Sequence, residues 1–351
     1  MVGRGLLGEL PRLLAAHCPA HAYAVISDSR VGELYGAPTV DALQAAGLRA
    51  RLFTFPCGEW NKTRATWADL TDALLAARIG RDGAVVALGG GVTGDLGGFV
   101  AATYLRGVPH VQVPTTLLAM IDASIGGKTG VDVPAGKNLV GAFHEPRLVL
   151  ADIETLATLP KQHIAAGMAE ALKHAVIADA AYLDAIVADA GALRARDLAA
   201  LARVVARSVA IKEEVVAADP RETGRRQVLN FGHTIGHAVE ARSGYGLLHG
   251  EAVAIGMAAE ARLAEMVGAT VPGLHATVRA ALERFGLPVT VPEELPADDL
   301  LETMLGDKKV RAGTVRFALP QRVGAALQRD DGAWTVEVDT ATILQVLVES
   351  R

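Results

Sequence analysis

Residues 83–98 read GAVVALGGGVTGDLGG, an apolar run that passes directly into a cluster of glycines. The run predicts a buried strand, and the glycines predict a tight turn into a helix. They contain the pattern GxGxxG, in which backbone N–H groups can approach a pyrophosphate at a helix N-terminus. The usual dinucleotide fingerprint follows the first strand and has an acidic residue about twenty positions further on, and this segment has neither feature. The alternative to nucleotide binding is therefore a turn that uses glycine only for close packing.

Similar apolar runs recur through the first part of the chain, separated by helical patterns. We predict strands at 22–26, 49–55, 83–88, 110–113 and 148–150, and a helix at 67–78. Strands that alternate with helices predict an α/β domain with a mainly parallel, Rossmann-like sheet. Asp28 follows the first strand and is the acidic residue best placed for a ribose, with Glu59 and Lys62 as further candidates.

The second part of the chain, after the segment TLP at 158–160, is rich in alanine, which favours helix. We predict helices at 165–178, 182–190, 197–217, 233–242 and 251–267, and a strand pair at 314–319 and 334–338. The change of pattern predicts two domains, 1–160 and 161–351, the second mostly α-helical.

Composition excludes several classes of protein. The 351 residues carry a formal net charge of −5, which argues against a general binder of nucleic acid or of anionic membranes. Cys18 and Cys57 imply no disulfide framework and fit a reducing cytosol. No apolar run in the sequence approaches the roughly 20 residues needed to span a bilayer. We therefore expect a cytoplasmic protein.

Two histidines four residues apart, His233 and His237, lie in the segment NFGHTIGH. A helix would place both imidazoles on one face, where they can grip a divalent cation, or one can ligate while the other handles a proton. A third nitrogen from His249 and a carboxylate from elsewhere would complete a catalytic shell. The alternative is a pair of ordinary helical histidines.

Glu170 is the candidate for that carboxylate. It lies three residues before Lys173 in a mostly apolar helical segment, so both side chains are expected to be partly buried and therefore paired or coordinating. Lys173 could then contact substrate oxygens beside the metal, and His174 is a weaker candidate ligand. A surface ion pair between Glu170 and Lys173 is the alternative.

Glycine-rich turns also contain Lys128, Lys137 and Asn138. Glycine lets the chain bring an ammonium group and backbone N–H groups to one anion. A single surface lysine is usually only solvated, but several in glycine turns with few other charges indicate a substrate that carries phosphate or carboxylate. Two further positive charges lie in the second part of the chain. Arg226 precedes the histidine segment, and Lys308 lies in a segment that is expected to be a loop.

Taken together, these segments resemble the 3-dehydroquinate synthases, a family of sugar-phosphate cyclases. The similar segments extend from about Gly58 to Lys309 and include GGGVTGDLGGF, VPTTLLAMIDASIGGKTGVD, GKNLVGAFHEP, GMAEALKH and LNFGHTIGHAVE. The resemblance implies an NAD-binding α/β domain at 1–160, a helical metal- and substrate-binding domain at 161–351, and a homodimer.

The resemblance also implies a lyase reaction of the shikimate pathway, which leads to aromatic amino acids. The substrate, 3-deoxy-D-arabino-heptulosonate 7-phosphate, would become 3-dehydroquinate and phosphate. NAD would oxidise it transiently, phosphate would be eliminated, hydride would return, and an intramolecular aldol step would close the ring.

Residue roles follow from the same resemblance. The divalent metal, zinc or cobalt, would be bound by Glu170, His233 and His249. The substrate and catalytic set would be Lys128, Asn138, Lys173, Lys212, Arg226, Asn230, Asp122, Lys308 and His237, the last near proton transfer. Arg106 would reach the phosphate from the partner subunit. The residues expected to contact NAD are Asp28, Glu59, Lys62, Gly90, Gly91, Val92, Asp95, Thr115, Thr116, Asp122, Lys137 and Thr158.

Three alternatives are weighed against this reading. Another sugar-phosphate cyclase would share the fold, NAD and metal. A metal-dependent polyol dehydrogenase of related fold would not need so many cationic groups. A non-catalytic NAD- or metal-sensing protein would not require Lys173 and His237.

Overall fold

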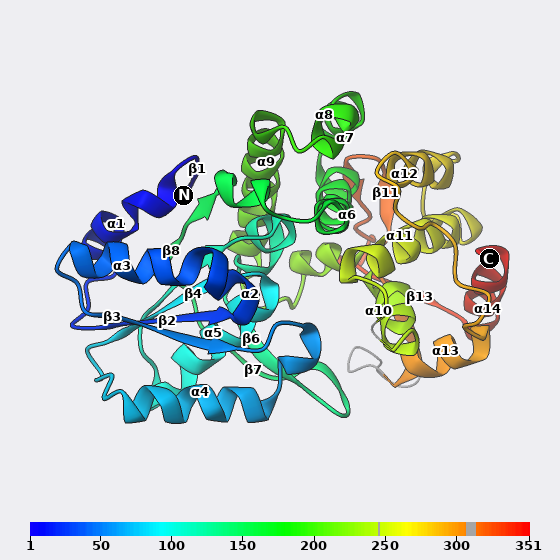
Figure 1. The fold of residues 1–351 in the computed structure, drawn as a ribbon. Helices are drawn as coiled ribbons and strands as arrows, with labels where there is room; N and C mark the ends of the chain where they lie inside the picture. The colour runs from blue at the N-terminus through cyan, green and yellow to red at the C-terminus, as the bar shows by residue number, and fades with distance from the viewer. Residues whose placement is uncertain (245, 307–313) are drawn as a thin grey trace. The chain divides into compact units, whose positions relative to one another are not determined.

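The computed structural model describes residues 1–244, 246–306 and 314–351, and it divides the chain into two compact units, Met1–Leu159 and Pro160–Arg351. The first unit is a parallel α/β structure and the second is mostly helical, which confirms the predicted fold class (Figure 1). Among the described residues, no helix combines the length and apolar character that crossing a membrane requires.

A five-stranded sheet forms the centre of the first unit. Its strands, in spatial order, are β3 (Ala50–Phe55), β2 (Tyr23–Asp28), β4 (Ala84–Gly89), β5 (His110–Pro114) and β8 (Leu148–Val149). All neighbouring strands are parallel. The chain passes outward from β2 to β3 and then returns to the other side of β2 at β4. The carboxyl ends of β2 and β4 therefore form a topological switch point, where open α/β sheets bind their ligands.

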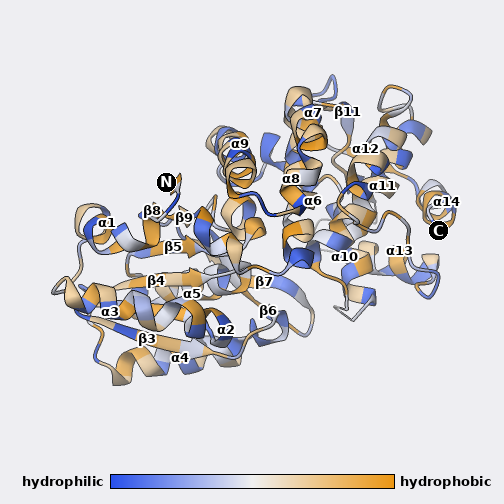
Figure 2. Cartoon of the chain, turned by 45° about the horizontal axis from the view of Figure 1, so that its top comes forward, coloured by the Kyte–Doolittle hydropathy of each residue, from blue (hydrophilic) through white to orange (hydrophobic). Residues whose placement is uncertain are grey.

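Helices cover both faces of this sheet, because alternate strand residues point to opposite sides. Ala24 and Ile26 of β2 belong to the core beneath α4 (Arg64–Ala76) and α5 (Gly91–Thr103). Tyr23 and Val25 belong to the core beneath α1 (Leu10–His17) and α3 (Ala37–Ala45). Strands buried on both faces are apolar along their whole length, as the colouring of β4 in Figure 2 shows.

Shorter elements complete the first unit. They are β1 (Val2–Gly3) paired with β9 (Ala151–Asp152), α2 (Ser29–Val31), the π-helices Gly32–Gly36 and Ala119–Ala123, and the 3-10 helices Leu6–Glu9, Glu59–Asn61, Tyr104–Arg106 and Ile153–Ala157.

An antiparallel hairpin of β6 (Lys128–Val133) and β7 (Gly136–Phe143) occupies the segments that were predicted only as glycine-rich turns. The glycines hid the strand pattern, yet the pairing needs them. Gly130 faces Gly141 across the hairpin, and a side chain at Gly141 would collide with the carbonyl of Thr129.

The second unit consists of helices with two small strand pairs. The helices are α6 (Lys161–Ala178), α7 (Ala180–Ala188), α8 (Ala190–Arg194), α9 (Leu198–Ala218), the 3-10 helix Arg225–Asn230, α10 (His233–Arg242), α11 (His249–Met266), α12 (Leu274–Glu283), α13 (Ala297–Leu305) and α14 (Thr340–Glu349). The strand pairs are β10 (Val315–Phe317) with β13 (Val336–Val338), and β11 (Pro320–Arg322) with β12 (Ala325–Ala326).

Helix α6 is the centre of this unit and contacts α7, α9 and α11. It is buried on nearly all sides from Ala166 to Ile177, as expected for a helix without a continuous polar face. The start of α11 packs so closely on α6 that a side chain at Gly250 would collide with the Ala166 carbonyl. Glycine at this position brings the neighbouring His249 toward the polar residues of α6.

Candidate active site

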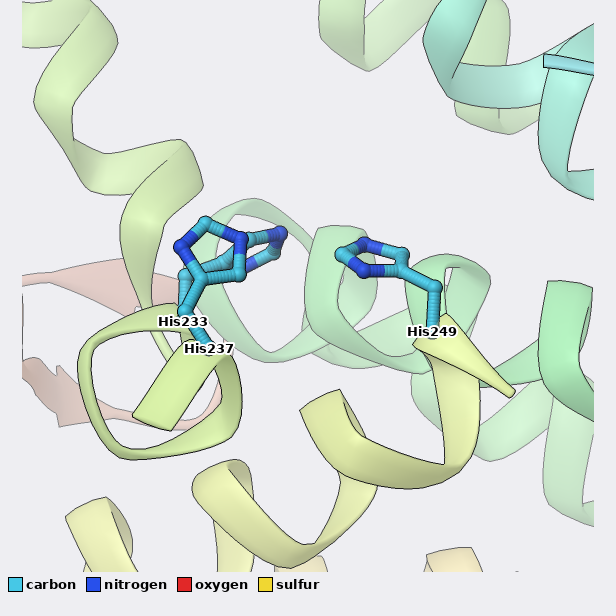
Figure 3. Close-up of side chains that lie close together, drawn as sticks. All are labelled: His233, His237 and His249. Carbon is cyan, nitrogen blue, oxygen red and sulfur yellow. The ribbon is translucent and has the colours of Figure 1, made fainter. Parts of the chain in front are cut away.

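Three histidines of the second unit gather at the starts of α10 and α11. His233 is the first residue of α10, His237 lies one turn later, and His249 is the first residue of α11. Figure 3 shows the rings facing one another, and one ring nitrogen from each lies within 4.8 Å of the others. The four-residue spacing places two rings on one helix face, and the close packing of the helices adds the third.

Glu170 of α6 is fully buried, and its carboxylate lies beside these rings. Oε1 is 3.4 Å from Nε2 of His233 and 3.6 Å from Nε2 of His249. Oε2 is paired with the Lys173 ammonium, whereas Oε1 faces the two imidazoles. Ligands about 2.0–2.1 Å from a tetrahedral zinc ion lie roughly 3.3 Å apart. The spacing therefore fits one divalent cation bound by Glu170, His233 and His249.

The charges around Glu170 keep it ionised. Burial alone would raise its pKa, but the Lys173 ammonium, which pairs with Oε2, and His233 hold that pKa well below its usual range. Burial would lower the pKa of His249, but contacts with Glu170 and Glu240 raise it to about 10. The site thus favours positive charge between the carboxylates, and a proton and a metal cation compete for this position.

The other nitrogen of each ligand imidazole has a partner of its own. Nδ1 of His233 donates to the Phe231 carbonyl at 3.1 Å, and Nδ1 of His249 lies 3.4 Å from Oε2 of Glu240. Contacts of this kind fix the ring orientation and direct Nε2 toward the metal position. Glu240 was not predicted as a site residue. Its signal is that it lies seven residues after His233 and so shares that face of α10.

Arg226 and Asn230 lie in the 3-10 helix that precedes α10. Asp219 holds the loop before this helix, because its Oδ2 accepts the backbone N–H groups of Gly224 at 2.7 Å and Arg226 at 3.0 Å. Asp219 was not predicted either, although Asp219 is followed directly by Pro220, and such a pair is a common signal for a turn.

Two further predicted residues of this part of the chain, Lys212 and His174, are not in the histidine cluster. Lys212 is buried on α9, and His174 is buried on α6. Lys308 lies outside the described residues.

The predicted nucleotide loop lies at the switch point of the sheet. The carboxylate of Asp28, at the end of β2, accepts a hydrogen bond from the Thr93 hydroxyl of α5 at 3.3 Å. Glycine serves packing later in this helix, since a methyl group at Gly97 would lie 3.0 Å from the Ala87 Cβ. At Gly91 the nearest atom would be at an ordinary 3.4 Å. Close packing therefore explains Gly97, and nucleotide binding by the turn at Gly91 stays a prediction.

Lys62 links several of the predicted cofactor residues. Its buried ammonium lies 3.1 Å from both Glu59 and Asp95 and 3.7 Å from Asp132, and Lys137 lies 3.2 Å from Glu59. Burial would lower the pKa of Lys62, but the three carboxylates raise it above its ordinary value. The loop before α4, the first turns of α5 and the β6–β7 hairpin are thus joined by ion pairs. Asp132 had not been predicted to take part.

The remaining predicted cofactor residues follow β5. The backbone N–H of Thr115 donates to the Gly89 carbonyl at 2.9 Å, which fixes Thr115 and Thr116 beside the glycine turn. Asp122 lies in the π-helix Ala119–Ala123. Thr158 follows the last 3-10 helix of the first unit, and its hydroxyl is 2.7 Å from that of Tyr35.

Lys128 and Asn138 lie on the β6–β7 hairpin but not side by side. Lys128 is paired with Phe143 at the open end, whereas Asn138 lies close to the turn at the other end. The expectation that these two residues surround one anion is therefore not supported within this unit.

Arg106 lies in a strained turn after α5. Leu105 and Arg106 have φ angles of 49° and 69°, in the left-handed region that non-glycine residues rarely occupy. Both side chains are exposed. Strain of this kind costs of order 1–3 kcal/mol per residue and concentrates at functional sites.

Two solved synthases share this fold over 99% of the chain. A 2-deoxy-scyllo-inosose synthase, complexed with carbaglucose-6-phosphate, NAD+ and Co2+, matches with a TM-score of 0.91 and 26% identity over 96% of its own chain. The 2-epi-5-epi-valiolone synthase of Streptomyces hygroscopicus subsp. jinggangensis, with NAD+ and Zn2+ bound, matches with a TM-score of 0.88 and 32% identity over 95% of its chain. By its fold, the chain therefore belongs to the same structural class as these two synthases.

Within that class, the sequence matches one family along most of its length. The family model for the 3-dehydroquinate synthase N-terminal domain matches residues 52–166, and the C-terminal model matches residues 167–310. A curated 3-dehydroquinate synthase from Symbiobacterium thermophilum is 50% identical over 332 residues, which cover 94% of this chain and 93% of the relative. The chain belongs to the 3-dehydroquinate synthase family, as the resemblance of its motifs predicted.

Proposed function

We propose that this chain is a 3-dehydroquinate synthase, a carbon–oxygen lyase that depends on NAD and a divalent metal. It would convert 3-deoxy-D-arabino-heptulosonate 7-phosphate into 3-dehydroquinate and phosphate. Membership of the family and 50% identity to a relative with that activity support the reaction. The single observation that carries the chemistry is the spacing of Glu170, His233 and His249, which fits one divalent cation.

The cofactor assignments rest on the donor groups in each unit. The two solved synthases bind NAD+ with Co2+ or Zn2+, which supports zinc or cobalt for the imidazole–carboxylate cluster of this chain. When bound, the metal would polarise a substrate hydroxyl, and NAD would accept a hydride and return it. The N-terminus of α5 would bind the pyrophosphate through backbone N–H groups, and Asp28 would accept the ribose hydroxyls.

Residues beside the metal ligands would contact the substrate. The Lys173 ammonium would bind substrate oxygens next to Glu170. His237 is not needed for ligation, so its imidazole would hold or transfer a proton. Positive and amide groups would bind the phosphate and carboxylate and position them for elimination. This set comprises Lys128, Asn138, Lys212, Arg226, Asn230 and Lys308, and we assign Asp122 to the same substrate site.

We assign a further role to Arg106 across a homodimer interface, where it would bind the substrate phosphate of the partner subunit. Its exposed guanidinium and its strained backbone support a functional role for this turn.

The test follows two signals in one cuvette. The purified protein receives the heptulosonate phosphate, zinc and a trace of NAD, and inorganic phosphate and NADH absorbance are recorded together. Phosphate release far in excess of the NAD present, without accumulation of NADH, is the expected result, because the hydride returns in each turnover. Accumulation of NADH without phosphate would indicate a dehydrogenase. Silence in both signals would reject this substrate and favour a sister cyclase that acts on another sugar phosphate.

The metal ligands are tested with a matched pair of histidine variants. His249→Ala is expected to abolish both bound metal and phosphate release, since it removes one of three ligands. His275→Ala removes a histidine of α12 outside the cluster and should keep both. A fully active His249→Ala protein that retains its metal would refute the assignment.

A further inference from the structure

Helices α10 and α11 pack without space for side chains between them. Gly232, the residue before α10, meets Gly256 of α11, and Gly236 one turn later meets Ala252. The contacts run in opposite directions along the two helices, so the helices are antiparallel. Because the backbones touch, the register of α10 on α11 sets the distance between the histidines that the two helices carry.

Glu260 lies one turn beyond Gly256 and fixes this register at the start of α10. Its side chain is fully buried. Oε2 accepts the backbone N–H of Gly232 at 2.7 Å, and Oε1 accepts that of Ile235 at 2.9 Å. The first N–H groups of a helix have no partner within the helix and form the positive end of its dipole, so a carboxylate is strongly favoured there. The two donors lie on either side of His233.

One of these hydrogen bonds reaches His233 through a single peptide unit. The N–H of Gly232 and the carbonyl of Phe231 belong to the same peptide group. Glu260 accepts from that N–H, and the carbonyl accepts from Nδ1 of His233 at 3.1 Å. Hydrogen bonds in such a chain polarise one another, so the carboxylate makes the Phe231 carbonyl a stronger acceptor. That carbonyl fixes the ring and directs Nε2 toward Glu170 and the metal position.

We propose that Glu260 is a positioning residue of the metal centre, which acts on the His233 imidazole through the Phe231–Gly232 peptide. The inference rests on the proposed function, because it requires the histidine cluster to bind a metal. Glu260 would act through this peptide and not on the substrate. Its effect is to hold the left-handed turn at Gly232, where φ is 80°, and with it the direction of the ligand nitrogen.

The same helix supplies a matched control. Glu265, five residues further along α11, accepts the backbone N–H groups of Gly273 at 2.9 Å and His275 at 3.1 Å, at the start of α12. It therefore also places a carboxylate at a helix start, through one oxygen instead of two, but α12 carries no member of the histidine cluster. If the loss of such a carboxylate affects only the stability of the fold, substitution of Glu260 and substitution of Glu265 should both show that effect.

The experiment measures zinc affinity by competition with a chelator, together with the thermal unfolding temperature, for the wild type, Glu260→Gln and Glu265→Gln. Both glutamine variants keep the volume and remove a negative charge from a helix N-terminus. At Glu260 glutamine also presents an NH2 group to one of the two N–H donors, whereas at Glu265 a single oxygen, Oε1, accepts both N–H groups. We expect Glu260→Gln to weaken zinc binding by about 10-fold or more, as loss of a group that orients a ligand does, and Glu265→Gln to leave it unchanged. Both variants are expected to lower the unfolding temperature.

An unchanged zinc affinity in Glu260→Gln would overturn the inference, and a lowered unfolding temperature alone would then assign Glu260 a structural role. A wild-type protein that binds no zinc or cobalt would instead remove the metal centre of the proposed function, so the two failures are distinguishable. If Glu260→Gln does not fold, Glu260→Asp takes its place. Aspartate keeps the charge but is one methylene too short, and the same affinity comparison decides.

Discussion

At the scale of single residues, the first unit contains a buried histidine that the proposed reaction does not use. His110 begins β5, is fully buried, and stacks on His144 with ring centroids 4.9 Å apart. Nε2 of His144 lies 2.9 Å from the Val108 carbonyl and donates to it. Burial, with a smaller contribution from His144, lowers the pKa of His110 to about 3. The ring is therefore neutral in the folded protein at every pH near neutrality.

This shift predicts an acid-sensitive contribution to stability. The pKa of His110 is lower in the folded protein than the ordinary value of 6.5, so the unfolded chain binds the proton first. The contribution to the free energy of unfolding is complete above pH 6.5 and is lost toward pH 3, by up to about 1.4 kcal/mol per pH unit.

His110→Phe keeps a stacked ring and is expected to reduce the slope of the unfolding free energy against pH between pH 6 and 4. Urea unfolding at several pH values measures it. His17→Gln, at an exposed position, should keep the wild-type slope, and an unchanged slope in His110→Phe would contradict the assignment.

The residue scale also shows where prediction from sequence succeeds. The proximity of Glu170 to Lys173 and of His233 to His237 could be predicted, because spacings of three and four residues within one helix determine which side chains share a face. Asp132 and Glu260 could not be assigned roles in this way, and for Glu240 the spacing indicates the helix face but not the partner, His249. Their partners lie on other elements, and the sequence does not state the register of one helix or strand against another.

At the scale of elements, the β6–β7 hairpin depends on one unusual backbone conformation. Asn138 has a φ of 55°, and its backbone N–H donates to Oδ1 of Asp132 at 2.9 Å. Asp132 in turn faces the buried Lys62 at 3.7 Å. The hairpin end that carries Asn138 is thus tied to the predicted cofactor residues. The apolar strands of the parallel sheet were predicted correctly, but this hairpin was missed because its glycines and its left-handed residue break the strand pattern.

Two substitutions separate the backbone role of Asn138 from that of its side chain. Asn138→Gly accepts a positive φ without strain, so its free energy of unfolding should stay close to that of the wild type. Asn138→Ala should lose about 1–2 kcal/mol, because alanine is strained in this region. If the amide contacts the substrate, both variants should raise KM about 10-fold, the equivalent of one hydrogen bond. Urea unfolding and steady-state kinetics measure the two effects. A wild-type KM in Asn138→Gly would remove Asn138 from the substrate site.

At the scale of the whole molecule, the proposal for Arg106 makes each active site depend on two chains. Glycine could adopt the positive φ angles at positions 105 and 106 without steric strain. The presence of strained non-glycine residues in this turn therefore supports a functional role for it. A closed dimer with two-fold symmetry places the same turn of each chain at equivalent positions, so each subunit would donate its arginine to the other.

Subunit mixing tests this dependence directly. Arg106→Ala and Lys173→Met are each expected to be inactive. In a mixed dimer, the chain with intact Lys173 receives the intact arginine of its partner, so one of the two sites is complete. Random exchange makes half of the dimers mixed, and about a quarter of the wild-type activity should return. Native mass spectrometry verifies that mixed dimers have formed, and two separate preparations of Arg106→Ala mixed together should gain nothing. Verified mixed dimers without activity would show that Arg106 acts within its own chain, because each mixed dimer would then lack either a lysine or an arginine in both of its sites.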